Sequence, residues 1–240
     1  MPKARSSRLL YHVVPAKQAW TFIRKRQDMT VYEYGDHKAP YVLIQPVDEH
    51  DLAGIESEIT RIEKLTDARF QLLAVKVDDW NRDLSPWEAP AVWGDADFKG
   101  GARDTLEFVQ GLCSDDGRKY ILGGYSLAGL FALWSGCQTD AFAGIAAASP
   151  SVWFPDFVTY MRDHDMRSPV VYLSLGDREA KTKNQVMATV ADCIGQCHDI
   201  LDKQNLSCTL EWNPGNHFKE PDLRMAKAFA WILNLVIDAR

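Results

Sequence analysis

The chain lacks the long apolar runs that mark leaders and membrane spans. Its first 20 residues carry scattered Lys and Arg but no apolar block of the roughly 7–15 residues that a signal peptide contains. No stretch approaches the about 20 apolar residues that cross a bilayer. Internal repeats and low-complexity segments are missing as well. We therefore expect neither a leader nor a membrane partner.

Cysteine is scarce and odd in number. The five cysteines are Cys113, Cys137, Cys193, Cys197 and Cys208. An odd count without a secretory context favours reduced thiols, so we expect a cytoplasmic protein.

Zinc-type ligand spacing is also missing. Cys193 and Cys197 lie on one face of an expected helix, next to Asp192 and His198, but no second ligand pair accompanies them. Apolar packing of these thiols is the simpler interpretation. We expect no metal.

Positive charge is in deficit, because 27 Lys and Arg stand against 33 Asp and Glu and give a net charge of -6. An acidic chain is repelled by phosphate backbones and by anionic membranes. We expect no nucleic-acid partner, and a small molecule becomes the default substrate. The sequence gives no indication of the oligomeric state.

What the chain does contain is an ordinary globular composition. It has 240 residues, 46% of them apolar. A chain of this size buries roughly 70–75% of the surface of the unfolded chain when it folds as one unit. We expect a single domain over residues 1–240, in which residues 1–28 form a weakly patterned amino-terminal extension with one apolar patch at 9–14.

Strands and helices alternate after this extension. We expect strands at 29–34, 41–44, 70–77, 120–122, 143–148, 170–175 and 208–212, and helices at 52–65, 105–112, 127–137, 154–166, 184–203 and 223–237. Right-handed crossovers between such strands imply an α/β fold, with a mostly parallel central sheet and helices on both faces. Ligands of these sheets bind at the carboxyl ends of the strands.

Residues 123–129 read Gly-Gly-Tyr-Ser-Leu-Ala-Gly between an expected strand and an expected helix. This is the pattern of a G-x-S-x-G nucleophile elbow, with Ser126 as the nucleophile. Gly124 and Ala128, two residues before and after it, let strand and helix pass closely. A glycine-rich turn that merely contains a serine is the alternative. A phosphate loop is disfavoured, since Leu130 stands where that motif requires Lys.

A serine nucleophile needs a base, and three histidines follow Ser126. His164 falls in an expected helix between two aspartates, where a solvated face explains it, and His198 lies in the middle of another helix. His217 follows the strand at 208–212 and precedes the last helix, so it lies at the carboxyl end of a strand. We predict His217 as the base, with an ordinary surface-loop histidine as the alternative.

The acid that orients the histidine should come from the loop after the preceding parallel strand. This loop reads Gly-Asp-Arg-Glu at 176–179. We prefer Glu179, because it is further from the strand end, and keep Asp177 as the alternative acid. The other carboxylate is expected to pair with Arg178 or Lys181, or to cap the following helix.

An oxyanion hole needs two backbone N–H groups. The first is predicted to be that of Leu127, which follows the nucleophile. The second should come from the loop at 45–48, where Pro46 has no N–H and Val47 is the better candidate, with Asp48 behind it.

The segment 79–99 holds three of the eight tryptophans: Trp80, Trp87 and Trp93. It follows the carboxyl end of a strand, so it should border the site, and long irregular loops are often functional. Trp87 and Trp153 are candidates for substrate binding. The alternative is that these rings only pack the loop against the body.

These motifs together resemble those of the α/β-hydrolase esterases, in the branch that includes S-formylglutathione hydrolase and enterochelin-esterase-like proteins. The resemblance covers most of residues 29–239 and depends on segments 123–129, 148–153, 176–179 and 215–218. It implies an α/β-hydrolase fold and a Ser-His-acid hydrolase without a cofactor. The acid of that family often stands three residues beyond the glycine, which corresponds to Glu179.

The expected function is hydrolysis of a small-molecule carboxylic ester through an acyl-enzyme on Ser126, with His217 as general base. A thioesterase or an acyltransferase would use the same residues with another substrate or acceptor. A catalytically silent binding protein that keeps the fold is the alternative from a different class, because fold does not determine function.

Overall fold

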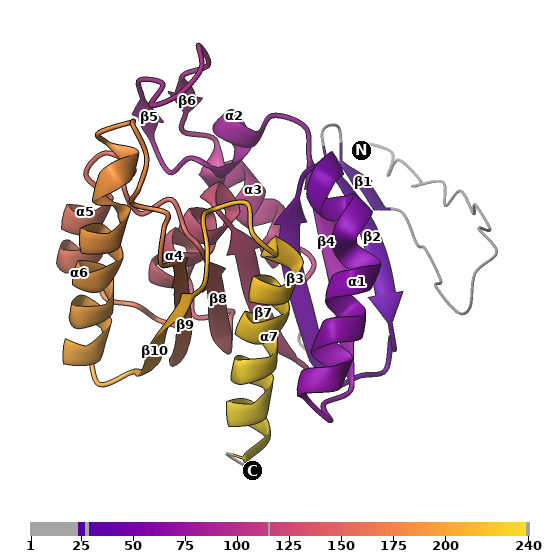
Figure 1. Cartoon of the computed structure of the whole chain (residues 1–240). Helices are drawn as coiled ribbons and strands as arrows, with labels where there is room; N and C mark the ends of the chain where they lie inside the picture. Colours follow the sequence, from indigo (N-terminus) through magenta and orange to yellow (C-terminus); the bar gives the residue numbers. More distant parts are fainter. Residues whose placement is uncertain (1–23, 27–28, 115, 239–240) are drawn as a thin grey trace.

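The computed structural model describes residues 24–26, 29–114 and 116–238 (Figure 1). Of the predicted extension at 1–28, only Arg24–Arg26 is described, and the apolar patch at 9–14 lies outside the described residues. In chain order the elements are β1 (Arg24–Arg26), β2 (Met29–Gly35), β3 (Tyr41–Val47), α1 (Glu49–Leu65), β4 (Phe70–Val77), α2 (Trp80–Leu84), β5 (Glu88–Ala89), β6 (Phe98–Lys99), α3 (Ala102–Gln110), β7 (Lys119–Tyr125), α4 (Leu127–Gln138), β8 (Gly144–Ala148), α5 (Phe157–Asp163), β9 (Val170–Gly176), the 3-10 turn η1 (Met187–Thr189), α6 (Val190–Lys203), β10 (Ser207–Asn213) and α7 (Pro221–Asp238).

Eight strands form the main sheet, in the order β1-β2-β4-β3-β7-β8-β9-β10. The two pairings of β2, with β1 and with β4, are antiparallel. The strands from β4 to β10 in that order pair in parallel. β3 and β9 are apolar almost throughout and buried along their whole length, as expected of parallel strands that are covered on both faces. The prediction of a mostly parallel sheet is confirmed.

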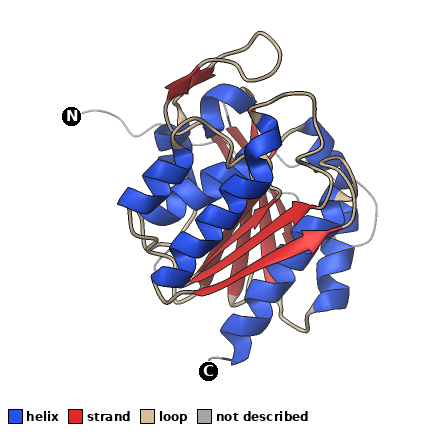
Figure 2. Ribbon diagram, turned by 60° about the vertical axis from the view of Figure 1, so that its left-hand side comes forward, coloured by secondary structure: helices blue, strands red, loops and turns tan. Residues whose placement is uncertain are grey.

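Helices cover both faces of this sheet, which Figure 2 shows between two helical layers. One face packs against α1 and α7, in an apolar cluster that includes Ile62 and Phe229. The other face packs against α2 to α6, in a second cluster that includes Phe131 and Ile194. The structure thus has an apolar core on each side of the sheet, as the sequence predicted.

Two predicted helices begin later than their apolar patterns suggest. α5 begins at Phe157 and not at 154, because Pro155 is followed by Asp156, whose backbone is left-handed with a φ of 63°. The helix expected from 184 opens with the turn η1, so regular α6 begins at Val190.

Other differences concern short elements without a periodic pattern. The predicted loop at 79–99 contains α2 and the hairpin β5–β6, and β1 was not predicted. β3 extends through Val47, so the residues expected in a loop at 45–47 belong to the strand.

The carboxyl ends of β3, β7, β8, β9 and β10 meet at one edge, at the top of Figure 1. The β5–β6 hairpin projects above this edge. Each loop that carries a predicted site residue leaves the sheet here. Among the described residues, no helix combines the length and apolarity needed to traverse a bilayer.

One carboxyl group lies buried between α1 and the sheet. Glu58 is 4% exposed and accepts a hydrogen bond of 3.3 Å from Nε2 of Gln45. Burial raises the pKa of Glu58 well above its ordinary value; the Gln45 bond opposes this, and Asp51 and Asp222 add to it. Oε1 of Glu58 and Oε1 of Gln45 have no hydrogen-bond partner among the described residues, so the neutral acid is the form that this site accommodates.

Glu58→Gln should stabilise the protein at high pH. An acid whose pKa is raised by folding stabilises the fold below its unfolded pKa, and this contribution is lost as the pH rises through the folded pKa. The variant stays neutral and offers an amide donor to Gln45, so its free energy of unfolding should exceed that of the wild type at pH 8 by about 1 kcal/mol or more. Urea unfolding at pH 5 and pH 8 measures the difference.

Glu56→Gln is the matched control, because Glu56 lies on the same helix and is exposed. It should behave as the wild type at both pH values. A gain from Glu58→Gln that is the same at pH 5 and pH 8 would contradict a buried neutral acid.

Candidate active site

Ser126 occupies the sharp turn between β7 and α4. Its φ of 57° and ψ of −120° are strained for a residue with a Cβ. The N–H of Ser126 donates to the carbonyl of Ala148 over 3.2 Å, and the carbonyl of Ser126 accepts from the N–H of Leu130 over 3.1 Å. The backbone contacts on both sides fix this conformation, and the predicted strand-turn-helix motif is present.

Gly124 is required by the close passage of strand and helix. A Cβ on Gly124 would lie 2.4 Å from the carbonyl carbon of Ala128 and 2.6 Å from its Cβ. Ala128 replaces the glycine of the usual motif, and its methyl group fits because the strand has no side chain opposite it.

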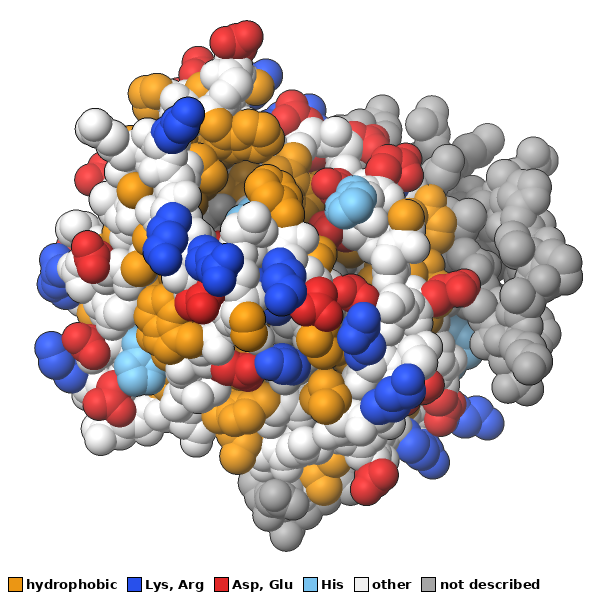
Figure 3. Space-filling model, in the orientation of Figure 1, with side chains coloured by type: hydrophobic (Ala, Val, Ile, Leu, Met, Phe, Trp, Pro, Cys, Tyr) orange, Lys and Arg blue, Asp and Glu red, His pale blue; other side chains and the backbone are white. Residues whose placement is uncertain are grey.

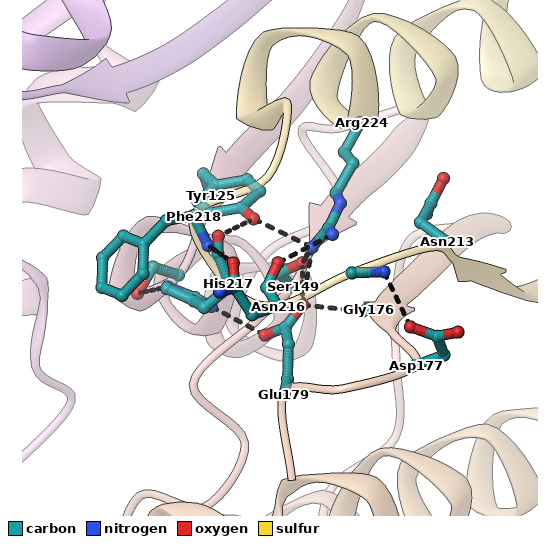
Figure 4. A network of polar contacts seen from close by, with 12 residues as sticks. Tyr125, Ser149, Gly176, Asp177, Glu179, Asn213, Asn216, His217, Phe218 and Arg224 are labelled. Atoms are coloured by element: carbon teal, nitrogen blue, oxygen red, sulfur yellow. Dashed lines mark hydrogen bonds and ion pairs between the residues drawn. The ribbon is translucent and has the colours of Figure 1, made fainter. Parts of the chain in front are cut away.

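His217 and Glu179 lie in a row with Ser126. Oγ of Ser126 is 3.1 Å from Nε2 of His217, and Nδ1 of His217 is 2.7 Å from Oε2 of Glu179. His217 comes from the connection between β10 and α7, and Glu179 from the loop after β9 (Figure 4). The side chain of Glu179 is 4% exposed and that of His217 is 27% exposed, so the row runs from a buried carboxylate towards the surface.

The carboxylate of Glu179 is supplied with donors on its other oxygen. Oε1 accepts from the N–H of Gly176 at 2.6 Å, from Oγ of Ser149 at 2.8 Å and from Nη1 of Arg224 at 2.7 Å. Burial by itself raises the pKa of Glu179, but the hydrogen bond and charge of His217, with the donors Ser149 and Gly176, outweigh it and hold the pKa below its ordinary value. The acid therefore stays ionised although it is buried.

Asp177, the alternative acid, faces elsewhere. Its Oδ1 accepts from the N–H of Gly215 over 2.7 Å, and its own N–H donates to the carbonyl of Asn213 over 2.8 Å. It ties the loop after β9 to the loop after β10 (Figure 4). Of the two predicted carboxylates, the structure brings Glu179 to His217.

The other two histidines lie outside this row. His164 directly follows α5, and its ring stacks on that of Tyr160 at a centroid distance of 4.0 Å. His198 lies in α6, with Nδ1 4.0 Å from a carboxylate oxygen of Asp199.

Solved structures with a similar fold include serine hydrolases and esterases. An IroE-like serine hydrolase from Shewanella oneidensis is 15% identical, with a TM-score of 0.69 over 88% of this chain and 77% of that chain. The siderophore hydrolase EstA from Aspergillus nidulans is 17% identical, with a TM-score of 0.68 over 94% and 99%. The enterobactin esterase FES from Shigella flexneri is 15% identical, with a TM-score of 0.62 over 95% of this chain and 62% of that chain. No family model and no curated protein sequence matches the chain.

The chain has the α/β-hydrolase fold. The fold class predicted from the sequence is confirmed, and the structural neighbours include esterases of this superfamily, as the motif resemblance implied.

The two backbone donors predicted for the oxyanion hole lie at the beginning of α4 and at the end of β3. The N–H of Leu127 opens α4 and has no acceptor inside the helix. Val47, the predicted second donor, is the last residue of β3 and is fully buried. Asp48 behind it caps α1, where its side chain accepts from the N–H of Asp51 over 2.8 Å. The oxyanion roles of Leu127 and Val47 stay predictions.

A second hydroxyl and a second carboxyl lie near the row. Oγ of Ser151, which is 3% exposed, is 3.3 Å from Oγ of Ser126. Burial, and then the charge of Asp48, raise the pKa of Asp51 to about 6; a hydrogen bond to the backbone of Asp48 opposes this shift, followed by the charges of His50 and of His217. The amino-terminal end of α1 thus belongs to the electrostatic surroundings of His217.

Three further contributors were not predicted from the sequence: Arg224, Tyr125 and Ser149. Arg224 is 2% exposed and meets the carboxylate of Glu179, while the hydroxyl of Tyr125 donates to the carbonyl of His217 over 2.6 Å. Arginine on a helix is most often solvent-exposed, so nothing in its sequence position signals this burial. Tyr125 lies inside the elbow motif and Ser149 in segment 148–153, so proximity to these motifs was the available signal.

Hydrophobic side chains gather around a hollow between the β5–β6 hairpin and the β10–α7 connection (Figure 3). Exposed apolar residues of these segments are Trp93, at 64%, and Phe218, at 85%. The Phe218 ring lies 5.5 Å from the His217 ring, edge to face. An exposed apolar ring therefore lies directly beside His217.

The contacts of Trp87 and Trp153 differ. Trp87 packs against Phe154, Phe157 and Tyr160 at centroid distances of 5.4–6.5 Å, and its Nε1 donates to the carbonyl of Pro155 over 3.2 Å. Trp153 stands two residues beyond Ser151 in the chain. Its half-buried ring lies 6.4 Å from the ring of Phe98. Their predicted role in substrate binding stays a prediction.

Among the described residues, no group of three or more His, Cys, Asp or Glu side chains is placed to hold a metal ion. The five cysteines are free thiols. Burial raises the pKa of Cys197 to about 12, so this thiol stays protonated.

Trp87→Ala should destabilise the fold, because it removes the ring that packs α5 against the hairpin loop. We expect the free energy of unfolding to fall by about 3 kcal/mol, whereas Trp153→Ala should cost less and raise KM for an ester. Exposed Trp93 supplies the control, since Trp93→Ala should leave stability unchanged. A Trp87→Ala variant of normal stability with a raised KM would instead assign that ring to the substrate. Urea unfolding and steady-state kinetics distinguish these outcomes.

Proposed function

We propose that the protein is a serine esterase that hydrolyses a small-molecule carboxylic ester through an acyl-enzyme on Ser126. The observation that carries this proposal is the row of Ser126, His217 and Glu179, with successive contacts of 3.1 Å and 2.7 Å. These are the hydrogen-bond distances that an activated nucleophile, its base and an orienting acid require. The esterase neighbours support the same reaction class at the level of the fold.

In the proposed reaction, Nε2 of His217 takes the proton of Ser126 while Oγ attacks the ester carbonyl carbon. The negative oxygen of the tetrahedral intermediate is held by the N–H of Leu127 and, in this proposal, by that of Val47. The alcohol leaves with the proton from His217. A water molecule, deprotonated by His217, then attacks the acyl-enzyme, and Ser126 takes the proton back as the carboxylic acid leaves. Glu179 accepts from Nδ1–H, which keeps Nε2 free to act as the base.

The chemistry needs no cofactor, because proton transfers and backbone donors supply each step. The apolar rim beside the site favours an acyl or aryl group on the ester. A panel of p-nitrophenyl esters of increasing chain length tests this preference. An acyltransferase would instead form a new ester when a second alcohol is present. A thioesterase would release the thiol from a thioester faster than it releases the alcohol from the matching ester.

Ser126→Ala should abolish ester hydrolysis while leaving the fold intact, and a fluorophosphonate probe should label the wild type alone. His217→Ala should lower turnover of p-nitrophenyl acetate by about 10⁴-fold or more, as the loss of a triad base does elsewhere. His164→Ala and His198→Ala are the controls and should stay near wild type. Labelling that persists without Ser126 would refute the assignment, and a wild type that neither reacts nor turns over would indicate a silent binding protein.

Glu179→Gln should lower kcat by up to about 10⁴-fold, because the amide cannot stabilise the imidazolium. Asp177→Asn keeps an oxygen to accept from Gly215 and should cost far less. The double variant belongs in the same experiment, since a neighbouring carboxylate can partly substitute for a missing one. If Asp177→Asn alone abolished activity, the roles would be reversed; if the double variant stayed near wild type, Ser126 and His217 would act as a dyad.

A further inference from the structure

We propose that Arg224 is a positioning residue of this site: its buried guanidinium joins the acid to the loop that carries the base, and its charge sets the pH range in which His217 works. The catalytic consequence rests on the proposed esterase function, whereas the effect on His217 does not need turnover to be observed.

The guanidinium contacts both Glu179 and the loop that carries His217. Nη1 donates to Oε1 of Glu179 over 2.7 Å, and Nη2 donates to the carbonyl of Asn216 over 2.9 Å and that of Pro214 over 3.4 Å. Asn216 directly precedes His217 in the chain. One planar group therefore fixes the acid on one side and the base-bearing loop on the other, which a point charge on a flexible stem cannot do.

Two hydroxyl groups complete the network. Nη1 also lies 3.1 Å from Oη of Tyr125 and 2.9 Å from Oγ of Ser149. The hydroxyl of Tyr125 in turn donates to the carbonyl of His217, and the hydroxyl of Ser149 donates to Glu179. Figure 4 shows Arg224 reaching from α7 towards Glu179 on the opposite loop. The backbone of His217 is thus held by a second route from the same guanidinium.

The ion pair is shielded from water, with 2% of the Arg224 side chain and 4% of that of Glu179 exposed. Shielding makes the charges interact more strongly than at the surface. The charges of Glu179 and Arg224 add to zero. A protonated His217 is therefore attracted less strongly by this ion pair than it would be by the Glu179 carboxylate alone.

The other titratable groups that face His217 carry less charge than Arg224 and Glu179. From α1, Asp51 contributes a carboxyl whose pKa is about 6, so it is charged over only part of the working range. From β7, Tyr125 stays neutral, since burial raises its pKa to about 12. Arg224 is the permanent cation of this set.

Two substitutions separate charge from geometry. Arg224→Lys keeps the charge and loses the fork, whereas Arg224→Gln loses the charge and keeps a planar donor. Lys227→Met is the matched control: it removes a cation three residues further along α7 that pairs with Glu211 and Asn213 on β10. The full chain is labelled with 15N-histidine, the His217 signal is assigned by its loss in His217→Asn, and its titration is followed by NMR beside the pH profile of kcat/KM.

We expect Arg224→Gln to move the His217 midpoint and the acid limb of kcat/KM to higher pH by about one unit, the lower end of what a nearby charge does. Arg224→Lys should keep the wild-type midpoint while kcat falls about 10–100-fold through misplacement. Lys227→Met should match the wild type in both. An unmoved midpoint in Arg224→Gln, or an equal movement in Arg224→Lys or Lys227→Met, overturns the proposal.

If Arg224→Gln does not fold, its double variant with Glu179→Gln replaces it, because removal of both charges leaves no unpaired buried ion. The midpoint should then be higher in the double variant than in Glu179→Gln alone, and equal midpoints overturn the proposal. The NMR titration also separates this inference from the proposed function. A shifted His217 in a protein that hydrolyses no ester would refute the esterase and leave the charge effect of Arg224 standing.

Discussion

The ion pair between Glu179 and Arg224 joins three segments that leave different elements of the fold. Glu179 comes from the loop after β9, His217 from the loop after β10, and Arg224 from the first turns of α7. These loops lack the regular pairing of strands, and contacts to one guanidinium stand in for it. Loss of the Glu179 charge would leave the Arg224 guanidinium buried without its ion-pair partner, and breaking a buried ion pair in this way costs about 3–5 kcal/mol. The position of His217 thus depends on an interaction that does not itself contact Ser126.

The sheet determines where these segments meet, and small residues determine how closely. Parallel strands deliver their carboxyl ends to one edge, so segments 126, 149, 176–179 and 213–217 converge although they are far apart in the chain. At Gly176 an added Cβ would lie 2.4 Å from the carbonyl oxygen of Gly215 and 2.9 Å from Oε1 of Glu179. A side chain there would separate the two loops that carry Glu179 and His217.

The sequence predicted much of this arrangement, for identifiable reasons. Apolar strands alternating with amphipathic helices predicted the parallel sheet and its two helical layers. Strand-turn-helix context located Ser126, and position after the last strand located His217. Short elements such as β1 and β5–β6 were missed, because two or three residues carry no periodic pattern. Segment 154–156 was assigned to a helix although Pro155 and a left-handed Asp156 exclude it.

The choice of acid depended on a residue that local sequence reasoning does not reach. Asp177 and Glu179 lie two positions apart in one loop, and the sequence favoured Glu179 while leaving Asp177 as the alternative. What distinguishes them is the set of donors around each: Asp177 accepts from the N–H of Gly215, while Glu179 receives His217 and three donors on its second oxygen. A buried carboxylate that faces a histidine must stay ionised to hold it, and that requires compensation from elsewhere. One of these donors, the Arg224 guanidinium, stands 45 residues further along the chain, so the surroundings of Glu179 are set jointly by the loop after β9 and by the first turn of α7.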